Sequence, residues 1–383
     1  MIKTLEPTKK KTGRRIGIRN AIMLSINAAC IFFLFLSYIA GHISPEHITF
    51  LAIFGLAYPA LLGANIFFVL WWVLLRRYFF LFSLLAVLAG YNELKSTFAI
   101  NFSKQYFPDS AGTEINLKVM TYNVRLFDLY NWTHNLDTRK KIFEMLKYES
   151  PDIICFQEFY NSDNEPFCNI EALGHILRAK NYHVDYSMTL RKKDHWGIAT
   201  YSTYPIIKRK TIHFGKKGGN LCLATDIVCG TDTLRIFNVH LESIRFKPED
   251  YKLVENFGSD NESQEIEKSK LILGRLKAAF ERRGRQADIM RTEIETSPYK
   301  VIVCGDFNDT PTSYAYRKIS KNLQDSFIES GTGMSQTYAG IFPSFRIDYI
   351  LHDKSFSSFG YEVIHKNFSD HFPVKSFITI GKK

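Results

Sequence analysis

The first 98 residues contain three apolar runs and few charges. Ala21–Ala40 is interrupted by only three polar residues and is long enough to cross a bilayer as a helix. Ile48–Leu75 is longer and ends near two adjacent tryptophans, a residue type that collects at membrane surfaces. Tyr78–Tyr91 is short for a span unless the helix continues to about residue 95. The pattern predicts a transmembrane region over residues 21–98, with about three helices at 21–40, 48–75 and 78–95.

Lysine and arginine positions predict the orientation of these helices. Residues 1–19 carry seven of them, residues 41–47 carry none, and Arg76-Arg77 follows the second run. Because positively charged segments stay inside, residues 1–20 are expected to form a basic cytoplasmic N-terminus. With three spans the rest of the chain is extracytoplasmic, and with two it is cytoplasmic. We expect three, and therefore an integral protein of the cytoplasmic (inner) membrane whose C-terminal domain lies outside.

From about residue 116 the pattern changes to short apolar strands between polar segments, which is typical of a soluble α/β domain. Strands are predicted at 117–122, 152–157, 197–201, 221–228, 234–240, 299–304 and 346–351. Helices are predicted at 138–148, 266–282 and 287–296, and the polar segment 245–263 is expected at the surface. Residues 99–115 are then a linker and residues 116–383 form one domain.

The positive charge belongs mainly to the N-terminal part. The whole chain has a formal net charge of +11. Residues 1–104 hold 11 Lys and Arg against 3 Asp and Glu, whereas residues 105–383 hold 38 against 35. The soluble domain is therefore nearly balanced, and its charge does not predict a nucleic-acid groove.

Polar residues of a few types stand at the ends of the predicted strands. In VIVCGDFND an apolar strand reaches Cys304, and a glycine then leads to Asp306 and Asn308. Any such residue alone is common at a solvated strand end. The series recurs along the chain as Asn123, Glu158, Asn238, His240, Asp306, Asn308, Asp348, Asp370 and His371. A repeated pattern of this kind indicates one site assembled from several strand ends.

The order and wording of these motifs resemble the endonuclease/exonuclease/phosphatase superfamily. GDFN, the RIDYI strand and SDHFPV carry the resemblance, which covers roughly residues 116–380. It implies a four-layer α-β-β-α sandwich of two packed β-sheets, here preceded by the helical transmembrane region. It also implies that the polar strand ends converge at one rim of the sandwich.

The resemblance implies a divalent metal, Mg²⁺ or alternatively Mn²⁺. Mg²⁺ prefers carboxylate and amide oxygens and keeps several waters, so one or two carboxylates suffice. By resemblance Glu158 is the principal ligand, with Asn123 beside it and Asp370 near the metal.

The remaining residues are assigned catalytic or substrate-binding roles by the same resemblance. Asn308 holds a phosphate oxygen, and Asp306 orients or deprotonates the attacking water. His371 donates to the transition state, and Asp348 fixes its tautomer. The sequence leaves open whether Asp306 or a histidine is the base. His240 is a second imidazole facing the phosphate, and the neighbouring Asn238 is assigned to substrate binding.

A basic segment precedes one of the predicted strands. Residues 191–217 hold eight Lys and Arg against one Asp. Arg191, Lys192 and Lys193 are interpreted either as a solvated loop or as a basic lip that binds a phosphate-bearing substrate.

Taken together, these features predict a membrane-anchored, divalent-metal-dependent phosphoesterase. The bond hydrolysed is a phosphodiester or, alternatively, a phosphomonoester. A nuclease and a phospholipid or sphingomyelin phosphodiesterase remain open, so the expected substrate is nucleic acid or a lipid head group. No feature predicts a protein partner. The alternative is a catalytically silent membrane module that binds a phosphorylated ligand or a protein. Silent relatives are expected to have lost some site residues, whereas all are present here.

Overall fold

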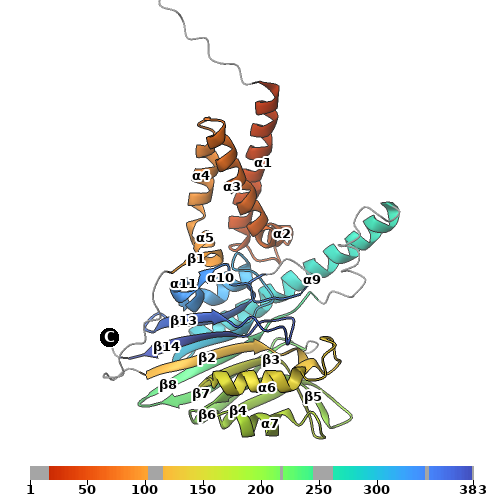
Figure 1. Ribbon diagram of the computed structural model, residues 1–383, viewed down its shortest axis with the longest axis vertical. Helices are drawn as coiled ribbons and strands as arrows, with labels where there is room; N and C mark the ends of the chain where they lie inside the picture. Colours follow the sequence, from red (N-terminus) through yellow and green to blue (C-terminus); the bar gives the residue numbers. More distant parts are fainter. Residues whose placement is uncertain (1–16, 102–114, 216–218, 245–261, 341–344, 382–383) are drawn as a thin grey trace, which may run out of the picture.

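The computed structural model describes residues 17–101, 115–215, 219–244, 262–340 and 345–381. N-terminal helices stand at one end of a domain built on two six-stranded sheets (Figure 1). One sheet has the order β10 (Leu323–Asp325), β12 (Asp348–Asp353), β9 (Lys300–Asp306), β8 (Asp232–His240), β7 (Leu221–Cys229), β6 (Ile206–His213). The other has the order β13 (Ser357–Val363), β14 (Val374–Ile380), β2 (Ile115–Asn123), β3 (Ile153–Ser162), β5 (Asp194–Ser202), β4 (Asn181–Leu190).

Each sheet contains one parallel pair of neighbouring strands, β2 with β3 and β8 with β9. A parallel pair needs a crossover connection, which α6 (Thr138–Glu149) and α9 (Glu262–Glu295) provide. The carboxyl ends of the four strands meet at one rim. There Asn123 Nδ2 donates to Asp306 Oδ2 across the two sheets at 3.0 Å. The topology therefore places the polar strand ends together.

Three apolar clusters fill the space between four layers. The central cluster lies between the sheets, and the outer clusters lie under α6 and α7 (Asn169–Ile176) on one side and under α9 and α10 (Tyr314–Ser320) on the other. Strand β9 contributes to two of them: Val301 and Val303 face outward, while Ile302 and Cys304 face the other sheet. Burial on both faces explains its continuous apolar run. The four-layer sandwich expected from the sequence is confirmed.

The strands predicted from the sequence are inner strands. All seven predicted segments correspond to β2, β3, β5, β7, β8, β9 and β12, each with neighbours on both sides. The pattern missed the edge strands β4, β6, β10 and β13, and one inner strand, β14. Edge strands carry exposed polar and charged residues among their apolar ones, as in the IIKRKTIH sequence of β6. These residues weaken the apolar pattern by which a strand is predicted.

Helix α6 agrees with its prediction, whereas the two helices expected at 266–282 and 287–296 form the single helix α9. The helix continues through Gly284. A Cβ at this position would lie 3.2 Å from Pro45 Cδ, so the glycine allows the loop between the first two helices to pack closely against α9. Most of the expected surface excursion, residues 245–261, lies outside the described residues.

The N-terminal helices are α1 (Ile18–Ala40), α2 (Phe50–Leu56), α3 (Tyr58–Leu74), α4 (Phe80–Ala89) and α5 (Tyr91–Thr97). The single helix predicted at 48–75 is instead a pair bent by 60°, with Pro59 in the first turn of α3. Proline there lacks the N–H that a continuous helix would need, which explains the break. Within the described residues, α1 alone is long and apolar enough to span a membrane, and the bent pair is a second candidate.

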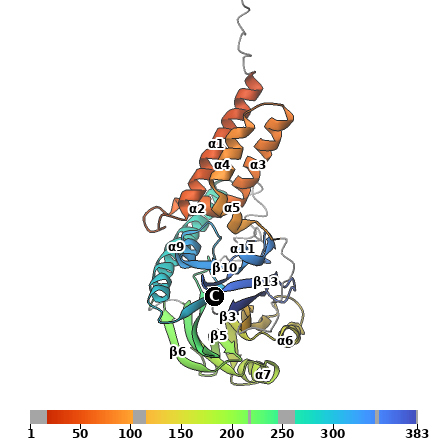
Figure 2. The same ribbon diagram turned by 90° about the vertical axis from the view of Figure 1, so that its left-hand side faces the viewer.

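Polar side chains lie inside the bundle of α1, α3 and α4, which run side by side in both views (Figures 1 and 2). Asn27 Nδ2 donates to Ser83 Oγ at 2.6 Å, and Trp72 Nε1 donates to Asn27 Oδ1 at 2.9 Å. These three residues are fully buried. Interhelical hydrogen bonds of this kind hold helices together where no water competes.

The helical region contacts the two-sheet domain directly. Arg285 pairs with Glu46 at 2.7 Å, and Arg317 pairs with Glu93 at 3.3 Å. The expected linker is docked at its start, because β1 (Ala99–Ile100) pairs with β11 (Thr332–Gly333). Residues 102–114 of that linker lie outside the described residues.

Candidate active site

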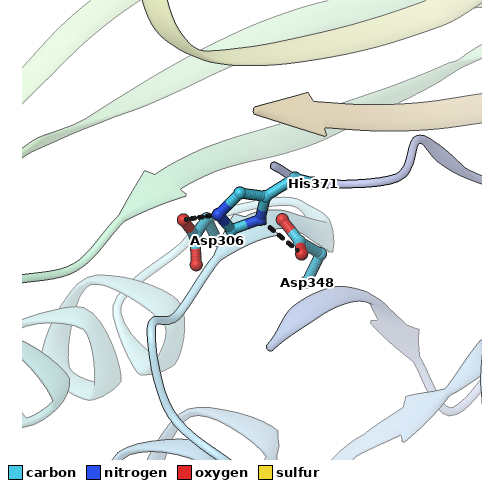
Figure 3. Close-up of side chains that lie close together, drawn as sticks. All are labelled: Asp306, Asp348 and His371. Atoms are coloured by element: carbon cyan, nitrogen blue, oxygen red, sulfur yellow. Dashed lines mark hydrogen bonds and ion pairs between the residues drawn. The ribbon is translucent and has the colours of Figure 1, made fainter. Parts of the chain in front are cut away.

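A histidine lies between two carboxylates at the rim (Figure 3). His371 Nδ1 hydrogen bonds with Asp348 Oδ2 at 2.9 Å, and its Nε2 faces Asp306 Oδ2 at 3.7 Å. All three side chains are buried. Burial alone would lower the pKa of His371, but the charges of Asp348 and Asp306 outweigh it and raise the pKa well above its usual value. In its protonated form the ring offers Nε2 as a donor.

Several donors surround the carboxyl group of Asp306. Its Oδ1 accepts from the Asn308 backbone N–H at 2.8 Å, and its Oδ2 accepts from Asn123 Nδ2 at 3.0 Å and Asn308 Nδ2 at 3.3 Å. His240 Nε2 lies 3.9 Å from the same Oδ2. Burial raises the pKa of Asp306, and the two imidazoles oppose the rise. Three donors around one carboxylate favour its charged form.

The backbone of the GDFND loop is fixed from behind. Gly305 has φ +144°, and a Cβ there would lie 1.9 Å from the Val239 carbonyl oxygen, so only glycine fits. Asp309, next to Asn308, is buried and accepts from Arg283 Nε of α9 at 3.0 Å. Burial raises the pKa of Asp309, and Arg283 opposes that shift. Asp309 thus anchors the loop rather than the substrate.

A β-bulge aims Glu158 toward the rim. Between Phe156 and Phe159 strand β3 has one residue more than its partner β5, and Glu158 has φ +47°. Burial raises the pKa of Glu158 to about 7, and the charges of Asp370 and Asp306 add to the rise. Glu158 therefore shares a confined space with other acids.

These acids fit a divalent metal. Glu158, Asp370 and the amide of Asn123 are oxygen donors, the type that Mg²⁺ prefers. Burial, together with the charges of Asp370 and Asp306, raises the pKa of Glu158, and a bound cation would favour its charged form. Asp306, Asp348 and His371 also bring ligand atoms within 4.8 Å of one another, but His371 already bonds to Asp348. The set around Glu158 is the better match to a hard cation.

Asn238 and the basic residues 191–193, which the sequence assigned to substrate binding, lie apart from the catalytic side chains. Asn238 is fully buried; its Nδ2 donates to the Ala199 carbonyl at 2.9 Å and its Oδ1 accepts from Gln157 Nε2 at 2.7 Å. It joins the two sheets, so we leave it out of the proposed substrate contacts. Arg191, Lys192 and Lys193 form the exposed turn between β4 and β5.

That turn lies at the correct rim but beyond the catalytic side chains. Asp194, the first residue after it, pairs with Ser162, four residues past Glu158 on β3. At about 3.3 Å per residue, the turn stands roughly 13 Å further along the strand direction. A small ester at Asp306 would not reach it, whereas an extended substrate would.

One group beside the site was not predicted from the sequence. Arg125 Nε lies 3.3 Å from Asp370 Oδ2, and its guanidinium lies 4.5 Å above the Trp132 ring. Tyr130 packs edge-on against Trp132 and is 60% exposed. The sequence signal was the aromatic pair in the polar stretch YNWTHN, residues 130–135, in the segment between the Asn123 strand and α6. Exposed aromatics beside a site are candidate stacking surfaces.

Comparison with known families agrees with this geometry. Residues 120–371 match the model of the Endonuclease/Exonuclease/phosphatase family. The chain belongs to this family. Its members are hydrolases that act on phosphoester bonds. Residues 20–97 match a separate model, described as a domain of unknown function (DUF8431).

Solved structures show the same fold at low sequence identity. An endonuclease/exonuclease/phosphatase family protein from Bacteroides thetaiotaomicron is 18% identical, with a TM-score of 0.51, and the match covers 70% of this chain and 96% of the other. A functionally unknown conserved protein from Enterococcus faecalis is 14% identical, with a TM-score of 0.50, covering 70% and 100%. No curated protein shows significant similarity to the chain.

Proposed function

We propose that the protein is a membrane-anchored, divalent-metal-dependent phosphoesterase whose catalytic domain lies outside the cytoplasm. The observation that carries the proposal is His371 held between Asp348 and Asp306, beside the acids around Glu158. A silent binding module has no need for an imidazole clamped between two carboxylates. The completeness of this arrangement favours the enzyme over the silent alternative.

The side chains divide the chemistry of phosphoester hydrolysis between them. Asp306, fixed by Asn123 and Asn308, orients the attacking water and accepts its proton. This assigns the role of base to Asp306. His371, oriented by Asp348, donates from Nε2 to a phosphoryl oxygen as negative charge develops there. His240, on the other side of Asp306, is placed to contact the same phosphate.

Glu158, Asn123 and Asp370 would hold the metal. A divalent cation in this position neutralises the phosphate and stabilises the leaving oxygen. Arg125 pairs with Asp370 and so orients one of the proposed ligands. It also brings Trp132 and Tyr130 to the edge of the site.

The substrate class is a phosphate ester with a group that can lie on these aromatic rings. A nucleic acid and a phospholipid head group both satisfy this description. Stacking on an exposed ring is worth about 1–3 kcal/mol per nucleic-acid base. The exposed turn at residues 191–193 contacts only long or polyanionic substrates, because it stands beyond the catalytic side chains.

The arrangement of the helices supports an anchor with three spans. α4 is short, yet it packs alongside α1 and α3 (Figures 1 and 2). The start of α1 and the turn between α3 and α4 lie at the same end of the bundle, away from the sheets (Figure 1). Arg76 and Arg77 belong to this turn. Because positive segments stay inside, this end is assigned to the cytoplasm and the catalytic domain to the outside.

The proposal is tested with the purified full chain in detergent. Hydrolysis should be followed on DNA, RNA, sphingomyelin, phosphatidylinositol and inositol phosphates, with Mg²⁺ or Mn²⁺ and with excess EDTA. We expect activity on at least one substrate, loss of that activity with EDTA and recovery with metal. Glu158→Ala should weaken metal binding measured by calorimetry. Full activity in excess EDTA would rule out the metal-dependent mechanism.

A further inference from the structure

The first residues of β12 lie at an open edge of their sheet. Strand β10 pairs with β12 only at residues 351–353, whereas β9 pairs with β12 from its start, where Asp348 stands opposite Asp306. Among the described residues, the start of β12 therefore has a strand on one side alone. A buried N–H at such an edge needs an acceptor from outside the sheet, because an unpaired buried N–H costs free energy.

Thr337, in the segment between β11 and β12, supplies this acceptor. Its Oγ1 accepts from the backbone N–H of Ile347 at 3.0 Å and from the backbone N–H of Asp348 at 3.1 Å. A hydroxyl oxygen has two acceptor lone pairs, so it satisfies both donors. Successive N–H groups of a regular strand point in opposite directions, so two that converge on one oxygen mark a bend in the backbone. Thr337 thereby fixes the direction in which the Asp348 side chain leaves the strand.

The same residue holds the segment that carries His371. The Thr337 carbonyl accepts from the Phe372 N–H at 2.7 Å, and Tyr338 forms an antiparallel bridge with His371. The Tyr338 ring packs edge-on against the imidazole, with 5.3 Å between the ring centroids. Thr337 is thus bonded to the backbone on both sides of the 2.9 Å hydrogen bond between His371 and Asp348.

Thr337 acts on the site only through these neighbours. It is 0% exposed, so it contacts no substrate, and the groups that it orients are the imidazole and one of the carboxylates in Figure 3. Ser369 holds the same segment from another side: its Oγ donates to the Asn123 carbonyl at 2.8 Å and accepts from the His371 N–H at 3.2 Å. Ser369 therefore ties His371 to β2, whereas Thr337 ties it to Asp348.

We propose that Thr337 is a positioning residue for the hydrolysis. Its hydroxyl sets the direction of Asp348 and its carbonyl sets the segment of His371, so that His371 presents Nε2 to a phosphoryl oxygen. The inference rests on the proposed function, in which His371 is the donor. It goes beyond that function, because Thr337 lies behind the catalytic side chains and belongs to none of the motifs GDFN, RIDYI and SDHFPV.

Three substitutions separate positioning from general stability. Thr337→Val keeps the shape of the side chain but removes the acceptor, and should lower kcat about tenfold with KM unchanged, because only the orientation of the donor is lost. Thr337→Ser keeps the oxygen and should keep the wild-type kcat. Thr225→Val is the matched control: this threonine of β7 is also 0% exposed, and its Oγ1 bonds with His183 Nδ1 at 2.8 Å. It should lose stability and keep kcat.

The first measurement is hydrolysis of bis(nitrophenyl) phosphate by the full chain in detergent with Mg²⁺, with rates compared for folded protein only. Where Thr337→Val does not fold, Thr337→Cys replaces it, because a thiol of similar size is only a weak acceptor, and kcat should then fall severalfold. A wild-type kcat in the folded variant would overturn the proposal. Equal loss in Thr337→Ser would overturn it as well, and so would equal loss in Thr225→Val, because the hydroxyl would then have no special role.

The second measurement needs no activity. In the full chain labelled with ¹⁵N-histidine, in detergent with EDTA, the proton between His371 Nδ1 and Asp348 is identified by the loss of its NMR signal in His371→Ala. A hydrogen bond to a carboxylate moves this proton far downfield. We expect the signal to move upfield or to exchange with water in Thr337→Val, and to stay in place in Thr337→Ser and Thr225→Val. An unmoved signal in folded Thr337→Val would contradict the role of Thr337. This result stands even where no substrate is hydrolysed, so it is distinguishable from failure of the proposed function.

Discussion

Helix α1 and helix α6 differ most in the side chains that they expose. In α1 the buried positions include Asn27 and Ser37, while Phe32, Phe33 and Phe35 are exposed. In α6 the buried positions include Ile142, Met145 and Leu146, and the exposed ones include charged residues such as Lys140 and Glu144. Helix α1 has little need to hide apolar surface, whereas α6 must do so.

The difference is the one expected if α1 lies in lipid, as proposed, while α6 meets water. Hydrophobic burial stabilises α6 in water, since each fully buried apolar side chain contributes about 1.5–3 kcal/mol. That driving force is absent in lipid, where polar groups must instead find partners inside the bundle. The short helix α4 follows the pattern of α1: Ser83 is buried, while Leu85 and Leu88 are exposed. This is the main support for counting α4 as a span.

The largest effect is expected at the polar rim of the catalytic domain. Asp306→Asn and His371→Ala should each lower the rate more than about a hundredfold, as expected for a positioned base or acid. Because both side chains are buried, the unfolding temperature of each variant is measured as well, and rates are compared for folded protein only. Asp232→Asn is the control, since this exposed carboxylate starts β8 at the end opposite His240. Near wild-type turnover in either variant would show that its assigned role is wrong.

A lysine placed on an exposed apolar position tests the two solvents directly. Leu85→Lys in α4 should cost about 2.5–3.5 kcal/mol if the residue faces lipid near the middle of the membrane. Leu136→Lys, at a 91% exposed position of the catalytic domain, should change stability by less than about 0.5 kcal/mol.

The readout is a reporter fused after Lys383 that is active only outside the cytoplasm. We expect the parent fusion and Leu136→Lys to be active outside, and Leu85→Lys to lose a large share of that signal. Equal signals from the two lysine variants would show that α4 does not lie in lipid. A cytoplasmic parent fusion would contradict the three-span topology itself.

Two buried asparagines, Asn238 in the catalytic domain and Asn27 in the helix bundle, allow the two regions to be compared by the same substitution. Asn238→Leu leaves Gln157 and the backbone carbonyls of Phe156 and Ala199 without their partner. Each unsatisfied buried group costs about 1–3 kcal/mol, so we expect the free energy of unfolding to fall by about 3 kcal/mol or more. Asn27→Leu removes a similar network in the bundle but should cost only about 1–2 kcal/mol, as interhelical bonds in membranes do. Unfolding of the full chain in detergent measures both. The reverse order would contradict the assignment of the two solvents.

The smallest effect is expected at the exposed turn of residues 191–193. Replacing Arg191, Lys192 and Lys193 with Ala should raise KM severalfold for DNA or anionic lipid and flatten its salt dependence, by about one unit of slope per lost phosphate contact. Turnover of a nitrophenyl phosphodiester should stay unchanged, because the turn stands beyond the catalytic side chains. Equal loss for both substrates would indicate a role in folding, and no loss would indicate a solvated loop.

The inner strands and the motifs could be predicted from local sequence because each carries its own signal. A strand buried on both faces, such as Val301–Cys304, is apolar throughout, while GDFN and SDHFPV are short and continuous. The edge strand β6 carries charges because it meets water on its open side, so its signal resembled a basic loop.

By itself, the sequence determined three apolar runs, a two-sheet domain and the set of residues at the catalytic rim. Tertiary structure alone decided that Asn238 joins the sheets while His240, two residues further along β8, approaches Asp306, and that Arg125 brings Trp132 to the site. Side chains two residues apart on a strand share one face, so the alternation of the sequence does not distinguish these two roles. What each side chain on that face meets, a partner in the other sheet or the residues of the site, depends on elements far away in the sequence, and no local pattern records it.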